Sequence, residues 1–268
     1  MPSSTATPSE KPRTADTEEI KSMGFLDHLE ELRKRIIWAL LSVVVGFGVC
    51  WAYAPRIYIL MQRPIMEALH RNNLSEKLVY LNPTEPFNIY LKVGLLAGVF
   101  VASPFILYQV WAFIAPGLYK NERHYVVPFM FSTVLLFLGG AYFGYRIVYP
   151  NALDFLISYG KDFQPMITIA SYTDLFLTII LGLGIIFELP IVVFFLALMG
   201  LVTGGWMWRN LRYAILVIFV VAAIITPTTD IVNMSVFAAP MIVLYMLSIV
   251  IAYVVHPAAR KRRALKKS

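Results

Sequence analysis

The sequence predicts an all-α integral membrane protein with six transmembrane helices. Hydrophobic residues make up 59% of the 268 residues, against about 45–50% in a soluble domain, and only 15% are charged. A bilayer core about 30 Å thick needs about 20 helical residues to cross it, and apolar stretches of roughly this length recur. These stretches cover residues 36–54, 87–114, 126–148, 175–199, 211–225 and 234–255.

The positions of lysine and arginine predict that both termini lie in the cytoplasm. The formal net charge is +7, and basic residues that flank membrane spans are retained on the cytoplasmic side. They gather before the first span, from Lys11 to Arg35, and after the last, from Arg260 to Lys267. The basic excess is therefore a topology signal that does not indicate nucleic-acid binding. Attraction to anionic membrane lipid is a second consequence.

Three regions are expected along the chain. Residues 1–22 are polar, lack the apolar segment of a cleavable signal peptide and predict a disordered cytoplasmic tail. Residues 23–255 form the six-span membrane domain, and residues 256–268 form a basic cytoplasmic tail.

Two amphipathic pieces are expected at the membrane surface. Phe25, Leu29, Leu32 and Ile36 recur at helical spacing, which predicts a helix lying along the membrane before the chain turns into the first span. Between the first two spans, residues 55–86 contain a second amphipathic piece and predict a small cap on the outer face.

The fourth span carries Glu188 about midway along its length, deeper than any other acidic residue in the predicted spans. A charge at that depth costs about 2.5–3.5 kcal/mol on insertion scales, so it marks a functional position. The alternative is a neutral Glu188 bonded to the carbonyl of Ile186, which Pro190 leaves without its usual donor. Pro190 also predicts a bend in this helix.

The fifth span is short. At about 1.5 Å per residue, 211–225 makes a helix about 22 Å long, against about 30 Å of hydrocarbon. A bent fourth helix beside a short fifth helix predicts a concave side wall.

Motifs for catalysis are missing. The chain contains no HExxH, no GxSxG and no phosphate-binding loop. The histidines lie outside the predicted spans, so no intramembrane metal site or proton relay through histidine is expected; they are His28, His70, His124 and His256. We therefore expect no enzyme, catalytic residue, metal or cofactor. A proton-coupled carrier of small solutes using Glu188, or a scaffold of another membrane complex, remain alternative functions.

Four motifs carry a resemblance. They are HLEELRKR before the first span, SPFILYQVWAFIAPGLYKNER at residues 103–123, FELP in the fourth span and TPTTD before the sixth. Together they resemble the TatC family, the multispanning subunits of the twin-arginine protein translocase. The resemblance covers about residues 23–255.

The resemblance implies a receptor for folded proteins that carry a twin-arginine signal peptide. It further implies a place in the cytoplasmic (inner) membrane and assembly with single-span TatA- and TatB-type subunits, as a homo-oligomer within a larger complex. Transport would be driven by the proton motive force without nucleotide. By motif, signal-peptide binding falls on Glu31, Arg33, Phe113, Pro116 and Glu122.

The resemblance also assigns partner contacts. Glu188 with Pro190 matches the intramembrane acid of the family, and Asp230 matches an acid of an outer turn. The chain departs from the family pattern at Met246, which follows Tyr245 where the pattern has an acidic residue. A partner contact that depends on that acid is therefore not implied here.

Recognition of two arginines fits these positions. The side chains of two consecutive arginines on an extended segment point to opposite sides. A protein that binds both therefore needs carboxylates from two different segments, here Glu31 and Glu122. The planar guanidinium suits bidentate pairing with a carboxylate, whereas lysine is a point charge. The alternative for Glu122 is stabilisation by the dipole of the following helix, worth about 0.3–1 kcal/mol. Glu31 and Arg35 also form an i,i+4 pair in the favourable order.

The topology is testable by thiol labelling after Cys50, the single cysteine, is replaced by alanine. Cysteines placed within residues 150–173 should react with a membrane-impermeant reagent added outside the cell, because this loop is expected on the outer face. Cysteines placed after His256 should react only once the membrane is opened. Labelling of the tail from outside would contradict the predicted orientation.

Overall fold

The computed structural model describes residues 25–75, 77–114, 126–160, 163, 165–226 and 231–265. Within these residues the chain is helical apart from turns, short connections and one isolated bridge between Val79 and Thr168. The elements are α1 (Phe25–Trp51), α2 (Ala54–Arg71), α3 (Glu85–Ile114), α4 (Val126–Phe143), the π-helix η3 (Gly144–Val148), α5 (Tyr149–Tyr159), α6 (Ile169–Ile186), α7 (Leu189–Leu198), α8 (Gly204–Arg209), α9 (Leu211–Ile225) and α10 (Ile231–Leu265).

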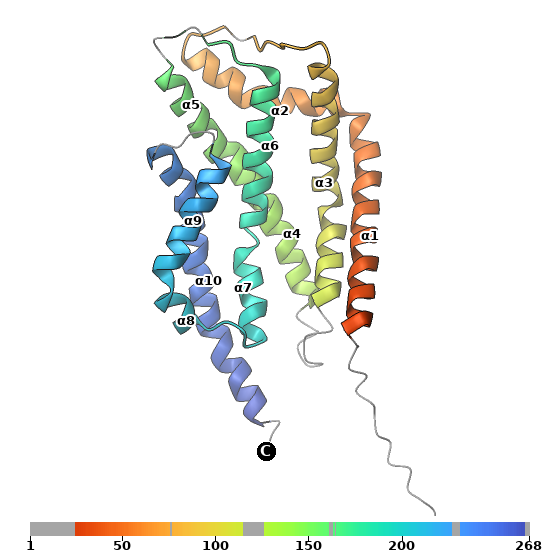
Figure 1. Cartoon of the computed structure of the whole chain (residues 1–268), viewed down its shortest axis with the longest axis vertical. Coiled ribbons are helices and arrows are strands. Elements are labelled where there is room, and N and C mark those ends of the chain that lie inside the picture. Colours follow the sequence, from red (N-terminus) through yellow and green to blue (C-terminus); the bar gives the residue numbers. More distant parts are fainter. Residues whose placement is uncertain are drawn as a thin grey trace, which may run out of the picture.

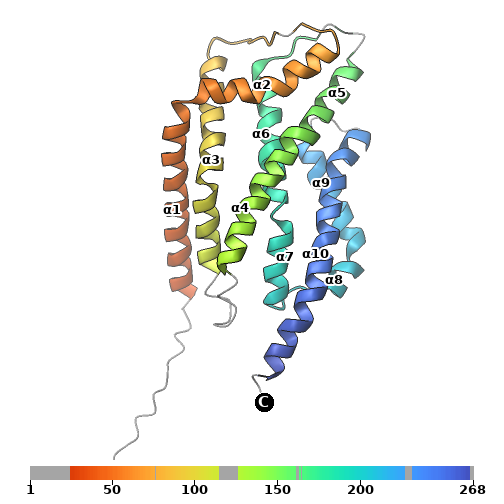
Figure 2. The ribbon, with the colours of Figure 1, turned by 180° about the vertical axis from the view of Figure 1, so that it is seen from behind.

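The predicted multi-pass, all-helical architecture is confirmed. Among the described residues, 5 segments are long and apolar enough to cross a membrane: His28–Trp51, Glu85–Ile114, Phe129–Tyr159, Ile169–Leu198 and Met234–Val255. Helix α9 is apolar but shorter, at 15 residues. The beginning of α1 and the end of α10 lie at the same end of the molecule, and α2 lies across the opposite end (Figures 1 and 2). The count of six spans stays a prediction.

The N-terminal helix differs from expectation. The prediction of a separate surface helix from Phe25 to Ile36 is wrong, because α1 continues without a break from Phe25 to Trp51. The apolar stripe from Phe25 to Ile36 suggested a separate helix, but it is the first part of α1, which begins well before its continuous apolar stretch. Its first turns lie beside the end of α3, where their side chains make contacts that the stripe does not reveal.

The third span is longer than expected. Its apolar stretch ends at 148, but the helix passes through η3 and continues as α5 to Tyr159. Tyr149 and Ala152 are fully buried and Leu153 nearly so, and this packing extends the helix beyond its apolar run. The loop predicted from residue 150 therefore begins about ten residues later, after α5 ends at Tyr159.

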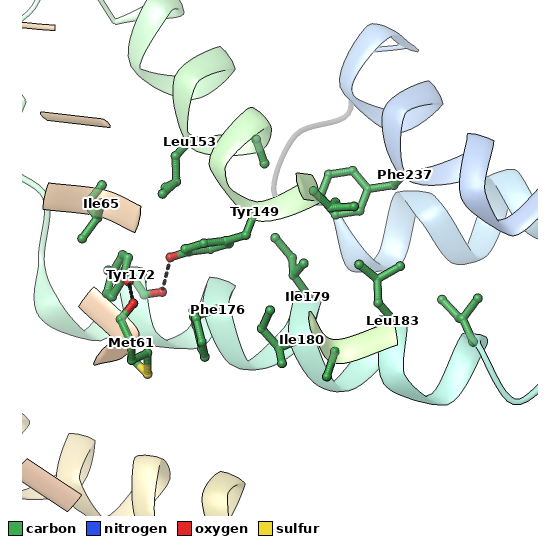
Figure 3. Packing of buried hydrophobic residues seen from close by; sticks show 14 of the residues in the cluster. Met61, Ile65, Tyr149, Leu153, Tyr172, Phe176, Ile179, Ile180, Leu183 and Phe237 are labelled. Carbon is green, nitrogen blue, oxygen red and sulfur yellow. Dashed lines mark hydrogen bonds between the residues drawn. The ribbon is translucent and has the colours of Figure 1, made fainter. Parts of the chain in front are cut away.

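The largest core cluster joins α2, α5, α6 and α10. Figure 3 shows Tyr149 and Tyr172 among apolar side chains such as Phe176, Ile179 and Phe237. The Tyr172 hydroxyl donates to the Met61 carbonyl, and the Tyr149 hydroxyl donates to the Tyr172 carbonyl at 3.3 Å. Because a buried hydroxyl without a partner is costly, these bonds fix helix α2 on α6 and α6 on α5.

The fourth span is interrupted where Pro190 predicted a bend. Helix α6 ends at Ile186, Phe187 and Glu188 form a turn, and α7 begins at Leu189 with Pro190 in its first turn. The two pieces nevertheless form one apolar segment long enough to cross a membrane. The concave wall beside this span stays a prediction.

Helix α1 packs mainly on α3, and the two backbones meet at glycines. A Cβ atom added to Gly98 would lie 2.6 Å from the Phe47 backbone nitrogen, and one added to Gly46 would lie 2.6 Å from the Gly98 carbonyl oxygen. Small residues allow such close approach where lipid surrounds the helices. The α1–α3 contact therefore leaves no room for a side chain at either glycine.

Alanine at Gly98 should therefore destabilise the protein by about 1–3 kcal/mol, the usual cost of overpacking. Gly48→Ala is the matched control, since a Cβ atom there meets nothing within 4 Å and alanine favours the helix. Thermal unfolding of the purified protein in detergent should show a lower Tm for Gly98→Ala alone. Equal Tm values for the two variants would contradict the close contact.

Candidate functional site

Arg35 connects α1 to α3 near the end of the molecule where α1 begins. Its Nη2 donates to Glu31 Oε1 at 3.2 Å, and its Nη1 donates to Gln109 Oε1 at 3.2 Å. The Gln109 side chain is buried, so the guanidinium is anchored from a second helix. The i,i+4 pairing of Glu31 with Arg35 is confirmed, and the bond to Gln109 was not foreseen.

A contact between two rings lies one helical turn before Glu31 on α1. His28 stacks on Phe113, with ring centroids 4.4 Å apart and an interplanar angle of 21°. Glu31 follows His28 by about one turn of α1, and Phe113 lies in the last turn of α3. The structure therefore brings two of the predicted site residues, Glu31 and Phe113, to one region.

Glu31 borders a pocket of about 380 Å³. The lining residues are Glu30, Glu31, Lys34, Arg35 and Trp38. The Glu31 side chain is 18% exposed, and its Oε2 atom is buried with no hydrogen-bond partner among the residues that the structure describes. A carboxylate accepts several hydrogen bonds, and a buried oxygen without a donor is costly. Oε2 of Glu31 is thus an acceptor that no donor of the described residues uses.

The other predicted site residues are placed less fully. Arg33 is exposed on α1. Pro116, Glu122 and Asp230 lie outside the described residues, so the meeting of Glu31 with Glu122 stays a prediction.

Sequence reasoning missed Gln109, His28 and Trp38. A signal for Gln109 existed, because an amide inside an apolar span needs a hydrogen-bond partner once it is buried. That requirement does not name the partner, which is Arg35, 74 residues away.

Glu188 lies at the edge of an exposed face of the interrupted helix. Of the residues three or four positions away, Ile185 and Val192 are 58% and 43% exposed, whereas Gly184 and Ile191 are buried, as is Pro190. Oε1 of Glu188 is buried and has no hydrogen-bond partner within the described part of the chain. The described residues contain no group of three or more His, Cys, Asp or Glu side chains that could hold a metal ion.

A protein-family model described as "Sec-independent protein translocase protein (TatC)" matches residues 27–240. The chain belongs to the TatC family. A TatC protein of Koribacter versatilis (strain Ellin345) is 70% identical over 98% of this chain and 97% of its own length. A TatC protein of Aquifex aeolicus (strain VF5) is 34% identical over 92% of this chain and 100% of its own length.

A solved structure is also similar. The crystal structure described as "Twin Arginine Translocase Receptor- TatC" superposes with a TM-score of 0.75 at 35% identity, covering 84% of this chain and 97% of that one. As a TatC-family member, this chain is a multi-pass membrane subunit of a protein translocase, works in a complex with other Tat components and is not an enzyme. Family membership favours the translocase function over the carrier and scaffold alternatives.

Proposed function

We propose that this TatC-family chain is the receptor and core subunit that binds twin-arginine signal peptides of folded proteins, at the end where α1 begins and α3 ends. The observation that carries the proposal is the half-bonded Glu31 carboxylate, which borders a pocket and has a buried oxygen without a donor. A guanidinium from a signal peptide supplies the donors that this oxygen lacks.

The second arginine is assigned to Glu122, which follows α3 in the chain. Consecutive side chains of an extended peptide point to opposite sides, so one arginine faces Glu31 and the other faces Glu122. Arg33, Phe113 and Pro116 complete the site, and the stacking of Phe113 on His28 supports this grouping.

The membrane arrangement follows the same proposal. The chain crosses the cytoplasmic (inner) membrane six times with both termini in the cytoplasm. The common end of α1 and α10 supports this arrangement, because an even number of crossings returns the chain to its starting side (Figure 1). The short helix α9 is then the fifth crossing in chain order and brings the total to six. Export of folded cargo is driven by the proton motive force.

Glu188 with Pro190 is the proposed contact for the membrane helix of a single-span TatA- or TatB-type subunit, and Asp230 is the proposed contact at the outer turn. Copies of this chain join the same complex. The exposed face around Glu188 and its buried, unbonded Oε1 support a polar partner group at this depth. A hydrogen bond across helices is a recurrent means of association in membranes.

Replacing Glu188 by alanine should weaken cysteine crosslinking to the partner helix at mid-membrane depth by about 3- to 18-fold, the range for one interhelical hydrogen bond. Signal-peptide binding should stay near the wild-type level, because Glu31 lies on another helix. Glu188→Gln should be milder, since an amide still forms hydrogen bonds. Equal loss of partner crosslinking and peptide binding, with a lower Tm, would indicate misfolding, whereas unchanged partner crosslinking would contradict the assignment.

Each of Glu31→Ala and Glu122→Ala should lower the affinity for a twin-arginine signal peptide by about 10- to 150-fold, the worth of one charged hydrogen bond. Binding of a fluorescent synthetic peptide to the full-length protein measures this, with Tm as the folding control.

Replacing both peptide arginines by lysine should lower the affinity for the wild-type protein much more than the affinity for the Glu31→Ala/Glu122→Ala double variant. The double variant lacks the carboxylates that pair with the planar guanidinium groups. A double variant that still prefers Arg-Arg over Lys-Lys as strongly as the wild type would show that other residues read the signal.

A further inference from the structure

We propose that the junction of α8 and α9 binds the phosphate headgroup of an anionic phospholipid, with Arg209 and Arg212 as the phosphate ligands. The junction lies at the end of the molecule where α1 begins (Figure 1). This lipid site is separate from the proposed signal-peptide site on α1 and α3, and its test does not depend on that proposal.

Arg209 and Arg212 carry positive charges that no carboxylate of the surrounding helices neutralises. Both residues are exposed, and no ion pair among the described residues involves either of them. Helices α7, α8, α9 and α10 contain no aspartate or glutamate. The two arginines are three residues apart, so their Cα atoms are separated by at most about 11 Å. Both long side chains therefore reach a single phosphate, the group that the planar guanidinium binds with two parallel hydrogen bonds.

An aromatic ring holds one of the two guanidinium groups in place. Nη2 of Arg212 donates to the Tyr213 hydroxyl at 3.2 Å, and its Cζ lies 4.8 Å from the centroid of the Tyr213 ring. These contacts use part of the donor set of Arg212, which has five N–H groups. The remaining donors are available to a phosphate.

Aromatic and apolar side chains place the arginines at the edge of the bilayer. Trp206 and Trp208 of α8 are 59% and 56% exposed, and Tyr213 is also exposed. Tryptophan and tyrosine gather where hydrocarbon meets water. In the next turn of α9, Leu216 and Val217 are exposed, so an apolar surface for an acyl chain begins beside the arginines. The neighbourhood thus fits both parts of a phospholipid, which favours a lipid over a soluble acidic ligand.

Packing against α10 fixes the backbone of α8. Met207 lies between the two exposed tryptophans in the chain, is itself buried, and its carbonyl accepts a hydrogen bond from the Tyr245 hydroxyl at 3.2 Å. A Cβ atom added to Gly204 would lie 2.6 Å from the ring of Tyr253, so the backbone lies directly on that ring. Because α8 is already held, lipid binding has little backbone left to order.

The length of α9 brings lipid headgroups to this depth. Its 15 residues make a helix about 22 Å long, against about 30 Å of hydrocarbon. A span shorter than the hydrocarbon is accommodated by local thinning of the bilayer or by flanking side chains that extend to the headgroups. A phosphate bound at the first turn of α9 holds the headgroup layer where this short helix begins.

The test uses tryptophan fluorescence of the full-length protein in mixed bilayers of phosphatidylglycerol and phosphatidylcholine. Brominated acyl chains quench an indole on contact, and only one of the two lipids is brominated in each sample. The exposed Trp38 and Trp51 are replaced by phenylalanine, and Trp111 is buried, so quenching reports Trp206 and Trp208.

Brominated phosphatidylglycerol should quench more strongly than brominated phosphatidylcholine at equal mole fractions. The expected relative affinity is about thirtyfold, because each arginine near the membrane surface contributes about fivefold. Arg209→Gln/Arg212→Gln should bring this ratio close to one at unchanged Tm. Arg209→Lys/Arg212→Lys should keep most of the ratio, since lysine also binds phosphate as a point charge.

Arg56→Gln/Arg63→Gln is the matched control, because it removes two exposed arginines from α2 at the opposite end. It should leave the lipid preference at Trp206 and Trp208 unchanged. Equal loss of preference in this variant and in Arg209→Gln/Arg212→Gln would reduce the effect to overall charge and overturn the inference. A wild-type protein that meets both lipids alike would also overturn it, and would leave the two arginines to an acidic protein partner.

Inorganic phosphate distinguishes a lipid headgroup from a free anion. Replacing chloride by phosphate at constant ionic strength should leave the quenching by brominated phosphatidylglycerol unchanged, because the acyl chains keep the lipid at the site. If phosphate abolishes the preference, the arginines bind the free anion and the lipid assignment is wrong.

Discussion

The backbone contact between α1 and α3 holds the candidate site together. Apolar side chains gain little by leaving lipid for one another, so α1 is held chiefly by close backbone approach and by polar bonds. The approach occurs at Gly46 and Gly98, where no Cβ atom fits, and the polar bond is that of Arg35 to Gln109. Since Glu31 lies on α1 and Phe113 on α3, the site exists only while these two helices stay in register.

Hydropathy predicted most of the fold because each helix that crosses a bilayer needs about 20 mostly apolar residues. The predicted end at Ile225 agrees with the structure, and Pro190 located the interruption beside Glu188. Hydropathy failed where packing decides the structure. Helix α5 follows an apolar run that ends at residue 148 because Tyr149 and Ala152 are buried in a core built by α2 and α6, which lie far away in the chain.

The sequence singled out individual acids of the candidate site but not the contacts around them. Within the described part of the chain, three buried side-chain oxygens lack a partner, and two of them belong to the predicted residues Glu31 and Glu188. The third, on Asp154, belongs to a carboxylate whose other oxygen pairs with Arg71. Charge and depth single out such acids in a sequence. The donor that holds Glu31, Arg35, is local and was predictable from its i,i+4 spacing, whereas the bond from Arg35 to Gln109 is a tertiary contact that no local pattern encodes.

Helix α3 links the surroundings of both acids. Gln109 and Phe113 lie on its face toward α1, and Trp111 between them lies on roughly the opposite face. There the indole nitrogen donates to Thr133 of α4 at 3.0 Å, and the ring lies 4.2 Å from that of Phe195, two turns beyond Glu188 in α7. One face of α3 therefore positions the Glu31 cluster while the other supports α7 behind Glu188, so a change in the packing of α3 alters the surroundings of both carboxylates.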